Sequence, residues 1–386
     1  MDAYLEFEKP IATLEKKLQD LRDLSRTENM DLANEIKALE SKVHSLIEET
    51  YKQLTPWQRV MVSRHPNRPH CLDYIESLFP DFLELQGDRA FREDGALVCG
   101  LAGWPPQPVK KDTCDLRPEA SILIMGHQKG RTTKQKMQRN FGMVRPEGYR
   151  KAIRLMEMAN RMRIPILTFV DTPGAYPSVD AEERGQSQAI AESIRTMFGL
   201  KVPVMTVVIG EGGSGGALAI GVGNHVMMLE HSTYSVISPE GCASILWSDA
   251  SLAERASDKL KMGATEVKAA GVIDGIIPEP KGGAHRDWNQ TFENVRLALL
   301  KHLDPWVKAH SQACRSKGAS SKGAPDFAAL RLEKFRAMGG QALGRTQPDG
   351  EPTSDQPKAK AKPKAEKSDK PAAKPKARKE ASRRDR

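Results

Sequence analysis

A glycine-rich stretch that begins at Val207, VVIGEGGSGGALAI, is where the residue types and their spacing could perform chemistry. Its glycines are Gly210, Gly212, Gly213, Gly215 and Gly216. Gly210, Gly212 and Gly215 match the G-x-G-x-x-G pattern of a dinucleotide-binding loop. Gly212 and Gly216, with Ser214 between them, match the G-x-S-x-G pattern of a hydrolase nucleophile elbow. A third interpretation is a row of backbone N–H groups at the start of a helix, which could stabilise an oxygen that becomes negatively charged.

The surrounding residues bear differently on the three interpretations. A dinucleotide loop needs a following helix and an acidic residue about 20 positions on; Glu230 meets the second requirement, but only about nine residues, 214–222, remain for the helix. A nucleophilic serine needs an acid and then a histidine later in the chain. No pair stands out among the candidates Asp249, Asp258, Asp274, His285 and His302. The third interpretation needs only the close backbone approach that glycine allows.

The elements around this stretch repeat one pattern, in which a buried strand leads into a glycine-containing loop and a helix. IPILTFVD (164–171) precedes TPGAYPS and a helix around AIAESIRTMF, and VPVMTVVI (202–209) precedes GEGGSGG. Further predicted elements are strands at ALVCGLAGW (96–104) and SILIMGH (121–127), a helix at EGYRKAIRLMEMANRM (147–162), and short strands with turns through 225–247. The sequence therefore predicts an α/β fold whose site lies where strands end and helices begin.

The two ends of the chain differ from this central part. Apolar residues recur at helical spacing through 4–53, with turn residues between two runs, which predicts a helical hairpin. From 311 the chain is rich in Lys, Pro and Ala, and residues 351–386 carry a net charge of +7. Because such a segment cannot bury enough apolar surface to offset its ordering entropy, we expect disorder from about 340. The predicted domains are a hairpin (1–54), an α/β domain (55–310) and a mostly disordered basic tail (311–386).

Cysteine usage and hydropathy exclude several classes of protein. The five cysteines are widely spaced and form no C-x-x-C pair, which argues against a disulfide framework and against a zinc ribbon. We therefore assign no metal ligands in this chain. No run approaches the roughly 18 apolar residues of a membrane span, and the first residues, MDAYLEFEKP, lack an apolar signal segment. We expect a cytoplasmic protein without a membrane partner.

Long collinear segments resemble the alpha subunit of the carboxyltransferase component of bacterial-type acetyl-CoA carboxylase. They cover roughly residues 4–305 and include GHQKGRTTKQKMQRNFGMVRPEGYRKAIRLMEMA, FVDTPGAYPSVDAEERGQSQAIA, VIGEGGSGGALAIGVGN and STYSVISPEGCASILW. The resemblance implies a crotonase-type fold of repeated ββα units. It also implies transfer of a carboxyl group from carboxybiotin on a carrier protein to acetyl-CoA, which yields malonyl-CoA for fatty-acid synthesis.

The same resemblance implies partners and substrates. In that family the alpha subunit acts in an α2β2 assembly with a beta subunit, which holds the zinc and most of the acyl-CoA site. Biotin carboxyl carrier protein and biotin carboxylase complete the system. No cofactor is expected to be bound covalently to this chain, and carboxybiotin and acetyl-CoA are expected as substrates. The alternative is a self-sufficient acyl-CoA hydratase or hydrolase of the same fold, which would use Glu211 or Ser214.

Site residues follow from the family's motifs. Gly212 and Gly213 are expected to hold the biotin carbonyl oxygen through their backbone N–H groups, as an oxyanion hole. The expected pocket around them is formed by Gly174, Ala175, Gly210, Gly215 and Gly216. Because the biotin anion can itself take the proton from the acetyl methyl group, the chain need not supply a general base.

The basic residues have two interpretations each. In the loop 127–139, Lys129, Arg131, Lys134 and Arg139 could attract the phosphates of CoA or an acidic carrier surface, or could simply be solvated. His127 is expected to be structural rather than catalytic. The tail could bind nucleic acid, but aromatic residues that stack on bases are absent after Phe335, which favours a tethering or solubilising role.

Overall fold

The apolar runs of the sequence form a mixed sheet in the computed structural model, which describes residues 4–28, 30–109, 118–315 and 325–338. Within these residues the sheet has eight strands in the order β1-β2-β3-β4-β5-β6-β8, and β7 pairs with β5. The strands are β1 (Leu83–Glu84), β2 (Leu97–Trp104), β3 (Ala120–His127), β4 (Ile166–Thr172), β5 (Val204–Gly213), β6 (His225–Leu229), β7 (Thr233–Ser235) and β8 (Gly275–Ile277). Pairing is antiparallel from β1 to β3 and parallel from β3 onward.

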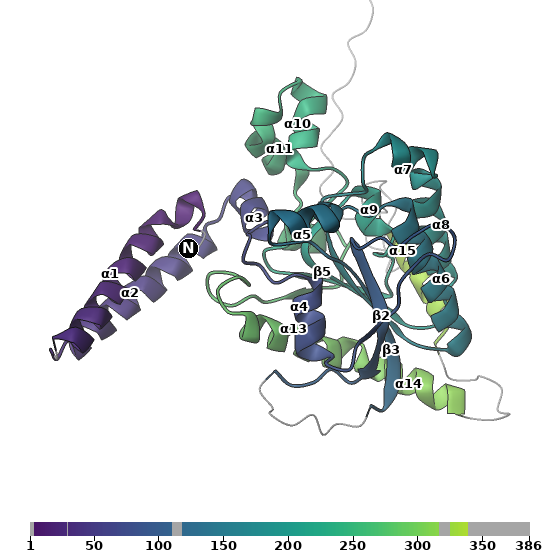
Figure 1. The fold of residues 1–386 in the computed structure, drawn as a ribbon, viewed down its shortest axis with the longest axis horizontal. Coiled ribbons are helices and arrows are strands. Elements are labelled where there is room, and N and C mark those ends of the chain that lie inside the picture. Colours follow the sequence, from purple (N-terminus) through teal and green to yellow (C-terminus); the bar gives the residue numbers. More distant parts are fainter. Residues whose placement is uncertain (1–3, 29, 110–117, 316–324, 339–386) are drawn as a thin grey trace, which may run out of the picture. The chain divides into compact units, whose positions relative to one another are not determined.

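Helices cover both faces of the sheet (Figure 1). One face packs against α6 (Pro146–Met162) and α8 (Gln186–Gly199), and the other against α4 (Cys71–Leu78), α13 (Trp288–His302) and α14 (Asp304–Arg315). In α6, Tyr149, Ala152 and Met156 are fully buried, at the spacing that puts side chains on one side of a helix. The predicted α/β class is therefore confirmed, with an apolar core on each face of the sheet.

The end of β5 leaves the main ladder and forms a second one. β5 pairs with β6 as far as Val208, and its residues 211–213 then pair with β7. β6 and β7 are consecutive strands followed by α10 (Pro239–Trp247), a ββα succession of the kind that the resemblance implied. The prediction of strands and turns through 247 was wrong at α10. Ser238 caps this helix by accepting a hydrogen bond from the Gly241 N–H, and Pro239 suits its first turn.

Shorter elements lie in the connections between these. They are α3 (Pro56–Ser63), α5 (Thr133–Gln138), α7 (Val179–Glu183), α9 (Ser214–Leu218), α11 (Ala253–Leu260), α12 (Ala264–Ala269) and the 3-10 turns η1 (Glu6–Glu8), η2 (Asn140–Gly142) and η3 (Ala250–Leu252). Thr55 and Thr132 cap α3 and α5 with their side-chain oxygens, so both helices begin where a hydroxyl can accept a first-turn N–H.

The predicted hairpin is present as α1 (Lys9–Thr27) and α2 (Ala33–Lys52). Ile11 and Val43 are buried between the helices in a cluster that also contains Val62 of α3. Polar contacts tie the hairpin to the rest of the chain: Arg286 pairs with Glu15 at 2.7 Å, and Lys281 pairs with Glu48 at 2.7 Å. The hairpin therefore packs against α3, which follows it in the chain.

The packed part of the chain extends beyond the predicted boundary at 310. That boundary falls inside α14, and α15 (Phe327–Ala337) follows. The Arg331 side chain of α15 is fully buried and donates to the carbonyl oxygens of Met197 and Leu200 at 2.7 and 3.0 Å. This helix is anchored because the buried guanidinium satisfies carbonyls at the end of α8. The disorder and the nucleic-acid binding expected from about residue 340 onward concern residues outside the described ones.

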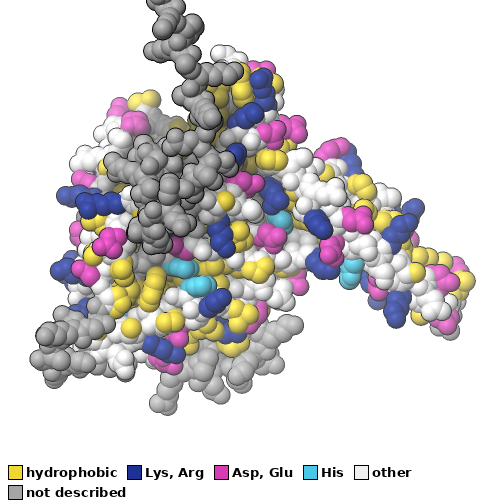
Figure 2. Space-filling view, turned by 180° about the vertical axis from the view of Figure 1, so that it is seen from behind, with side chains coloured by type: hydrophobic (Ala, Val, Ile, Leu, Met, Phe, Trp, Pro, Cys, Tyr) yellow, Lys and Arg dark blue, Asp and Glu magenta, His cyan; other side chains and the backbone are white. Residues whose placement is uncertain are grey.

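Surface charge is mixed on the face seen in Figure 2, where Lys and Arg side chains alternate with Asp and Glu. This pattern agrees with a body that is nearly neutral once the +7 of residues 351–386 is set apart from the total of +9. Of the helices in the described ranges, none has the length and apolar character that a membrane crossing requires.

Candidate active site

Two glycine-containing segments, residues 172–175 after β4 and residues 210–216 at the end of β5, lie against each other. A Cβ atom added at Gly216 would lie 2.6 Å from Ala175 N and from Gly174 C. At Gly213 it would lie 2.1 Å from the Pro173 carbonyl oxygen. No side chain fits at such distances, so glycine is required here by the close approach of two backbones. The structure therefore brings the two predicted parts of the pocket together.

The glycines of 210–213 belong to a strand, and their placement in a loop before a helix was wrong. Gly212 pairs with Tyr234 and Gly213 with Ser235, because β7 offers a ladder partner that the local pattern does not reveal. Helix α9 begins at Ser214 and ends at Leu218, so it is shorter than the 214–222 available. A dinucleotide loop is excluded because its first two glycines lie in β5. The N–H groups of a first helical turn are those of residues 214–216.

Gly212 and Gly213 line a cavity of about 20 Å³, roughly the space of one water molecule. Pro173, Glu211 and Arg64 line the same cavity. Its remaining walls are Val60, Thr233, Ser235, Ile237, Ser238, Pro239 and Met262. The other predicted pocket residues, Gly174, Ala175, Gly210, Gly215 and Gly216, lie outside this lining. Gly210 has a packing role instead, because a Cβ there would lie 2.3 Å from Asp171 Oδ1.

A row of five charged side chains, Asp171, Lys129, Glu211, Arg64 and Glu240, runs beside this cavity. Lys129 Nζ lies 2.7 Å from Asp171 Oδ1 and 2.8 Å from Glu211 Oε2. Arg64 continues the row, with Nε 2.6 Å from Glu211 Oε1 and Nη1 2.5 Å from Glu240 Oε1. The Glu211 N–H donates to Asp171 Oδ1 at 3.0 Å. The row thus fixes both the side chain and the backbone of the residue that precedes Gly212.

Electrostatics keep Glu211 and Lys129 ionised. Burial raises the pKa of the Glu211 carboxyl, but the Lys129 and Arg64 cations outweigh burial and lower its pKa to about 2. Burial lowers the pKa of the Lys129 ammonium, but Asp171 and Glu211 outweigh burial and raise it. A general base works best with a pKa near the operating pH, so Glu211 is poorly suited to proton transfer. This disfavours the alternative in which Glu211 acts as the base of a hydratase.

Ser214 has part of the geometry of a nucleophile but not its partners. Its φ of +57° is left-handed, as in a strained strand-to-helix turn, and its side chain is exposed. Over the described ranges, no hydrogen bond joins Ser214 Oγ to a histidine. The candidate partners are engaged elsewhere: His285 stacks on His65, and His302 stacks on His225. The hydrolase interpretation therefore lacks a base.

His127, at the end of β3, is fully buried. Burial lowers the pKa of its imidazole to about 4, and the nearby Asp171 carboxylate only partly offsets this. The ring is therefore neutral near pH 7 and adds no positive charge to the site. The structural role expected for His127 stays a prediction.

The predicted basic contacts do not form one cluster. Lys129 belongs to the charged row, and its side chain is only 16% exposed. Arg131 pairs with Asp73 at 2.5 Å, and Arg139 donates to the Gly95 carbonyl oxygen at 2.7 Å. Lys134 is exposed on α5. Sequence reasoning missed Arg64, Asp171 and Glu240; the only signals were the Arg- and His-rich segment around residue 64 and an acid at the end of the apolar run 164–171.

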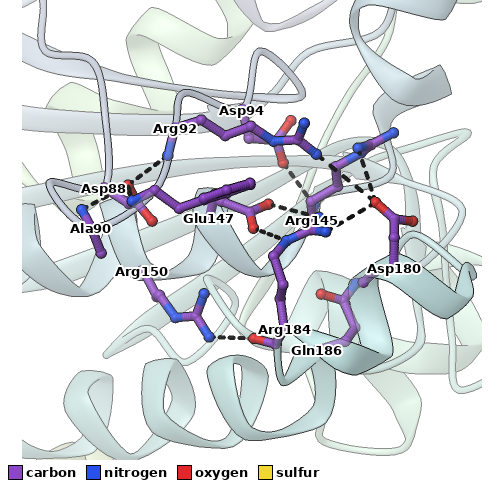
Figure 3. Close-up of polar contacts among 12 residues, drawn as sticks. Asp88, Ala90, Arg92, Asp94, Arg145, Glu147, Arg150, Asp180, Arg184 and Gln186 are labelled. Atoms are coloured by element: carbon purple, nitrogen blue, oxygen red, sulfur yellow. Dashed lines mark hydrogen bonds and ion pairs between the residues drawn. The ribbon is translucent and has the colours of Figure 1, made fainter.

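An arginine cluster holds the segment that follows Ala175 (Figure 3). Asp180 Oδ2 lies 3.1 Å from Arg184 Nη1, 3.5 Å from Arg145 Nη1 and 4.0 Å from Arg92 Nη2. Arg184 also pairs with the fully buried Glu147 of α6. These contacts fix residues 176–186 to α6, so the glycine segment 174–175 is anchored on both of its sides.

Glu8, His65 and His285 have ligand atoms within 4.8 Å of one another, as a metal site would. The two imidazole rings are stacked, with centroids 3.8 Å apart and planes 22° apart. A metal ion bound by both rings would have to lie in both ring planes, and stacked planes have no such point close by. Glu8 also accepts hydrogen bonds from Tyr51 and from the Leu5 N–H. We therefore describe this group as a buried polar cluster that joins η1 to the body.

Comparison with known proteins places the chain in a family. A family model described as acetyl co-enzyme A carboxylase carboxyltransferase-like matches residues 4–322. The acetyl-coenzyme A carboxylase carboxyl transferase subunit alpha of Geobacillus sp. (strain WCH70) is 49% identical over 345 residues, which are 89% of this chain and 98% of that protein. The protein of the same name from Thioalkalivibrio sulfidiphilus (strain HL-EbGR7) is 54% identical over 310 residues, or 80% of this chain and 93% of that protein.

Two solved structures are similar to the chain at low sequence identity. A Pseudomonas malonate decarboxylase hetero-tetramer in complex with coenzyme A gives a TM-score of 0.49 at 15% identity, over 70% of this chain and 97% of the matched chain. The beta subunit of Pseudomonas aeruginosa geranyl-CoA carboxylase gives 0.48 at 16% identity, over 71% and 46% of the two chains. On the family model and the sequence relatives, the chain belongs to the family of acetyl-CoA carboxylase carboxyltransferase alpha subunits.

Proposed function

We propose that this chain, as the alpha subunit of an acetyl-CoA carboxylase carboxyltransferase, takes part in moving a carboxyl group from carboxybiotin to acetyl-CoA, the step that forms malonyl-CoA. The observation that carries the proposal is the position of Gly212 and Gly213, which we call the glycine wall, beside the charged row. Gly212 and Gly213 line a cavity, while Glu211 and Lys129 beside them are locked in ion pairs. Such a site would act through backbone donors and rigid geometry rather than through a titrating side chain.

The role of this chain follows from where charge develops. When biotin gives up its carboxyl group, negative charge remains on the ureido oxygen. The N–H groups of Gly212 and Gly213 would donate to that oxygen, and their missing side chains let it approach the backbone. Gly216 would keep α9 close to Gly174 and Ala175, and Gly210 would keep β5 close to Asp171 of β4, while Gly215 remains a proposed pocket residue. No proton acceptor is required of this chain, which suits a Glu211 with a pKa of about 2.

The charged row would position the glycine wall. Glu211 precedes Gly212, and Lys129 and Arg64 hold its carboxylate from two sides. Its backbone N–H is held by Asp171 of β4. Movement of the wall relative to β4 would break at least one charge-assisted hydrogen bond, so the row resists displacement of the amides.

The proposal includes partners and location. A beta subunit would supply the zinc and most of the acyl-CoA site in an α2β2 assembly, and the carboxyl group would arrive on a biotin carboxyl carrier protein charged by biotin carboxylase. Lys129, Arg131, Lys134 and Arg139 remain proposed contacts for CoA or the carrier. We place the reaction in the cytoplasm.

Reconstitution tests the proposal. The full chain is purified alone and together with a matching beta subunit, and malonyl-CoA-dependent carboxylation of biocytin is measured, with the beta subunit alone as the control. We expect activity from the pair and none from either chain alone. Inactivity of a correctly assembled pair would overturn the proposed function, and activity of this chain alone would overturn the shared site.

A further inference from the structure

A second pocket, of about 220 Å³, lies beside the charged row. It is formed by the end of α3, the segment 65–70 and the residues between β3 and η2. The basic side chains on its walls are Arg64, His65, His70, Lys129, Arg131 and Lys136. Among the residues the structure describes, no Asp or Glu lines this pocket. Its side-chain polar groups are therefore nitrogen atoms, most of which can only donate hydrogen bonds.

The carboxylates that balance these cations stand outside the lining. Asp171 and Glu211 pair with Lys129, Glu211 and Glu240 pair with Arg64, and Asp73 pairs with Arg131. Lys136, on α5, forms no ion pair within the described ranges and is exposed. A ligand in the pocket would thus meet positive groups first, and at least one of them has its charge uncompensated.

His70 adds an observation that points to a ligand. Its side chain lines the pocket, the residue is 6% exposed, and Nδ1 has no hydrogen-bond partner among the described residues. A buried polar atom without a partner is unfavourable and calls for a ligand or a water. Burial lowers the pKa of the His70 imidazole, so the ring is neutral near pH 7. A neutral ring with its proton on Nδ1 would donate one hydrogen bond to an oxygen in the pocket.

Phe141 gives the pocket an aromatic wall. Its side chain is 50% exposed, and its φ of +56° is left-handed, between Asn140 at +46° and Gly142 at +81°. This backbone is unfavourable for a large side chain, and it keeps the ring at the pocket rather than in the core. A half-exposed ring next to several cations suits a ligand that combines an anion with a flat ring.

We propose that this pocket binds a phosphate group of a nucleotide-bearing ligand, with the phosphate among the basic side chains and the base against Phe141. At about 220 Å³ the pocket is smaller than the roughly 300–1,000 Å³ of sites that enclose a drug-sized molecule. It therefore takes the phosphate end rather than the whole ligand. The source is either the nucleotide of the acyl-CoA substrate, in which case the inference rests on the proposed function, or a separate phosphorylated nucleotide.

Calorimetric titration of the full chain at fixed salt tests this site. The probes are 3′-phosphoadenosine 5′-phosphate, CoA, dephospho-CoA and pantetheine. We expect the first to bind and pantetheine, which lacks phosphate, not to bind. Lys136→Gln should weaken binding of the first probe by about tenfold, the range of one charge-assisted contact. The matched control is Lys201→Gln, because Lys201 is an exposed lysine that precedes β5, at the opposite end of that strand from Glu211.

The probes also identify the source of the phosphate. Binding of CoA that is at least tenfold tighter than that of dephospho-CoA, and that is lost in Lys136→Gln, assigns the pocket to the 3′-phosphate of CoA. Binding of 3′-phosphoadenosine 5′-phosphate that CoA does not displace assigns it to a separate nucleotide. Equal binding by Lys136→Gln, Arg131→Gln and the unmodified chain overturns the site, because the basic tail then accounts for the affinity. That result leaves biocytin carboxylation by the α–β pair intact, so the two proposals fail separately.

Discussion

One methyl group at Gly213 tests whether the contact between the two glycine segments sets the position of the amides. A Cβ built there lies 2.1 Å from the Pro173 carbonyl oxygen and 3.0 Å from that of Thr172, where ordinary contact begins at 3.4 Å. Both neighbours are backbone atoms and cannot rotate away. In Gly213→Ala, therefore, the end of β5 and the segment 172–175 must separate by about 1 Å.

The expected loss follows from that displacement. A misplacement of about 1 Å can cost roughly 10²-fold in rate, and loss of one oxyanion donor costs about 10²–10³ in kcat. We expect kcat of the α–β pair to fall by about 10²–10³-fold, which corresponds to about 3–4 kcal/mol of transition-state stabilisation. Overpacking should also lower the free energy of unfolding by about 1–3 kcal/mol.

The assay is malonyl-CoA-dependent carboxylation of biocytin, with urea unfolding and co-purification of the beta subunit as checks on folding. Gly215→Ala is a milder variant for comparison, because its Cβ meets only the flexible Ile190 Cγ2 at 3.4 Å. We expect its kcat to fall by less than about tenfold. Gly199→Ala is the matched control, because no atom lies within 4 Å of its Cβ. A folded, beta-binding Gly213→Ala enzyme with kcat within tenfold of the unmodified enzyme would refute the reasoning.

Two further predictions concern stability. The pKa of Glu211 is about 2 in the folded chain against an ordinary 4.5. Its contribution to the free energy of unfolding is therefore complete above pH 4.5 and is lost as the pH falls toward 2. Stability measured by urea unfolding from pH 6 to pH 3 should therefore fall less steeply in Glu211→Gln than in the unmodified chain, and parallel curves would contradict this. Arg331→Met leaves buried carbonyl oxygens unsatisfied and should cost about 3 kcal/mol of unfolding free energy. The exposed Glu333→Gln on the same helix should cost under about 0.5 kcal/mol, and equal losses in both variants would remove the role given to Arg331.

Local pattern was sufficient for much of the fold. Continuous apolar runs located β4 and the first part of β5, and helical periodicity located the hairpin and α6. It was not sufficient where a distant partner decides the conformation. Gly212 and Gly213 are extended because β7 pairs with them, and no local preference of glycine indicates a strand. α10 was missed although Ser238 and Pro239 are a recognisable helix start, because the short apolar run after them fits either element.

The candidate site was predicted in its backbone but not in its side chains. The motif resemblance selected both glycine segments, and the close contact of Gly213 with Pro173 brings them together. The charged row could not be predicted from the sequence, because Arg64 lies 147 residues from Glu211 and 176 from Glu240 in the chain. A single sequence carries no signal for pairs at such separations. Lys129 forms ion pairs with Asp171 and Glu211, which its place in a basic loop does not indicate.

In the proposed site, the backbone of residues 212–213, and not the neighbouring Ser214 side chain, stabilises the developing charge. The most direct measurement is kcat of Ser214→Ala in the reconstituted α–β pair, with biocytin and malonyl-CoA as substrates. Because Ser214 Oγ has no hydrogen bond to a histidine in the described ranges, its loss should leave kcat within about twofold. A fall of roughly 10³-fold or more in a folded, beta-binding variant, the scale expected for a lost nucleophile, would contradict the claim.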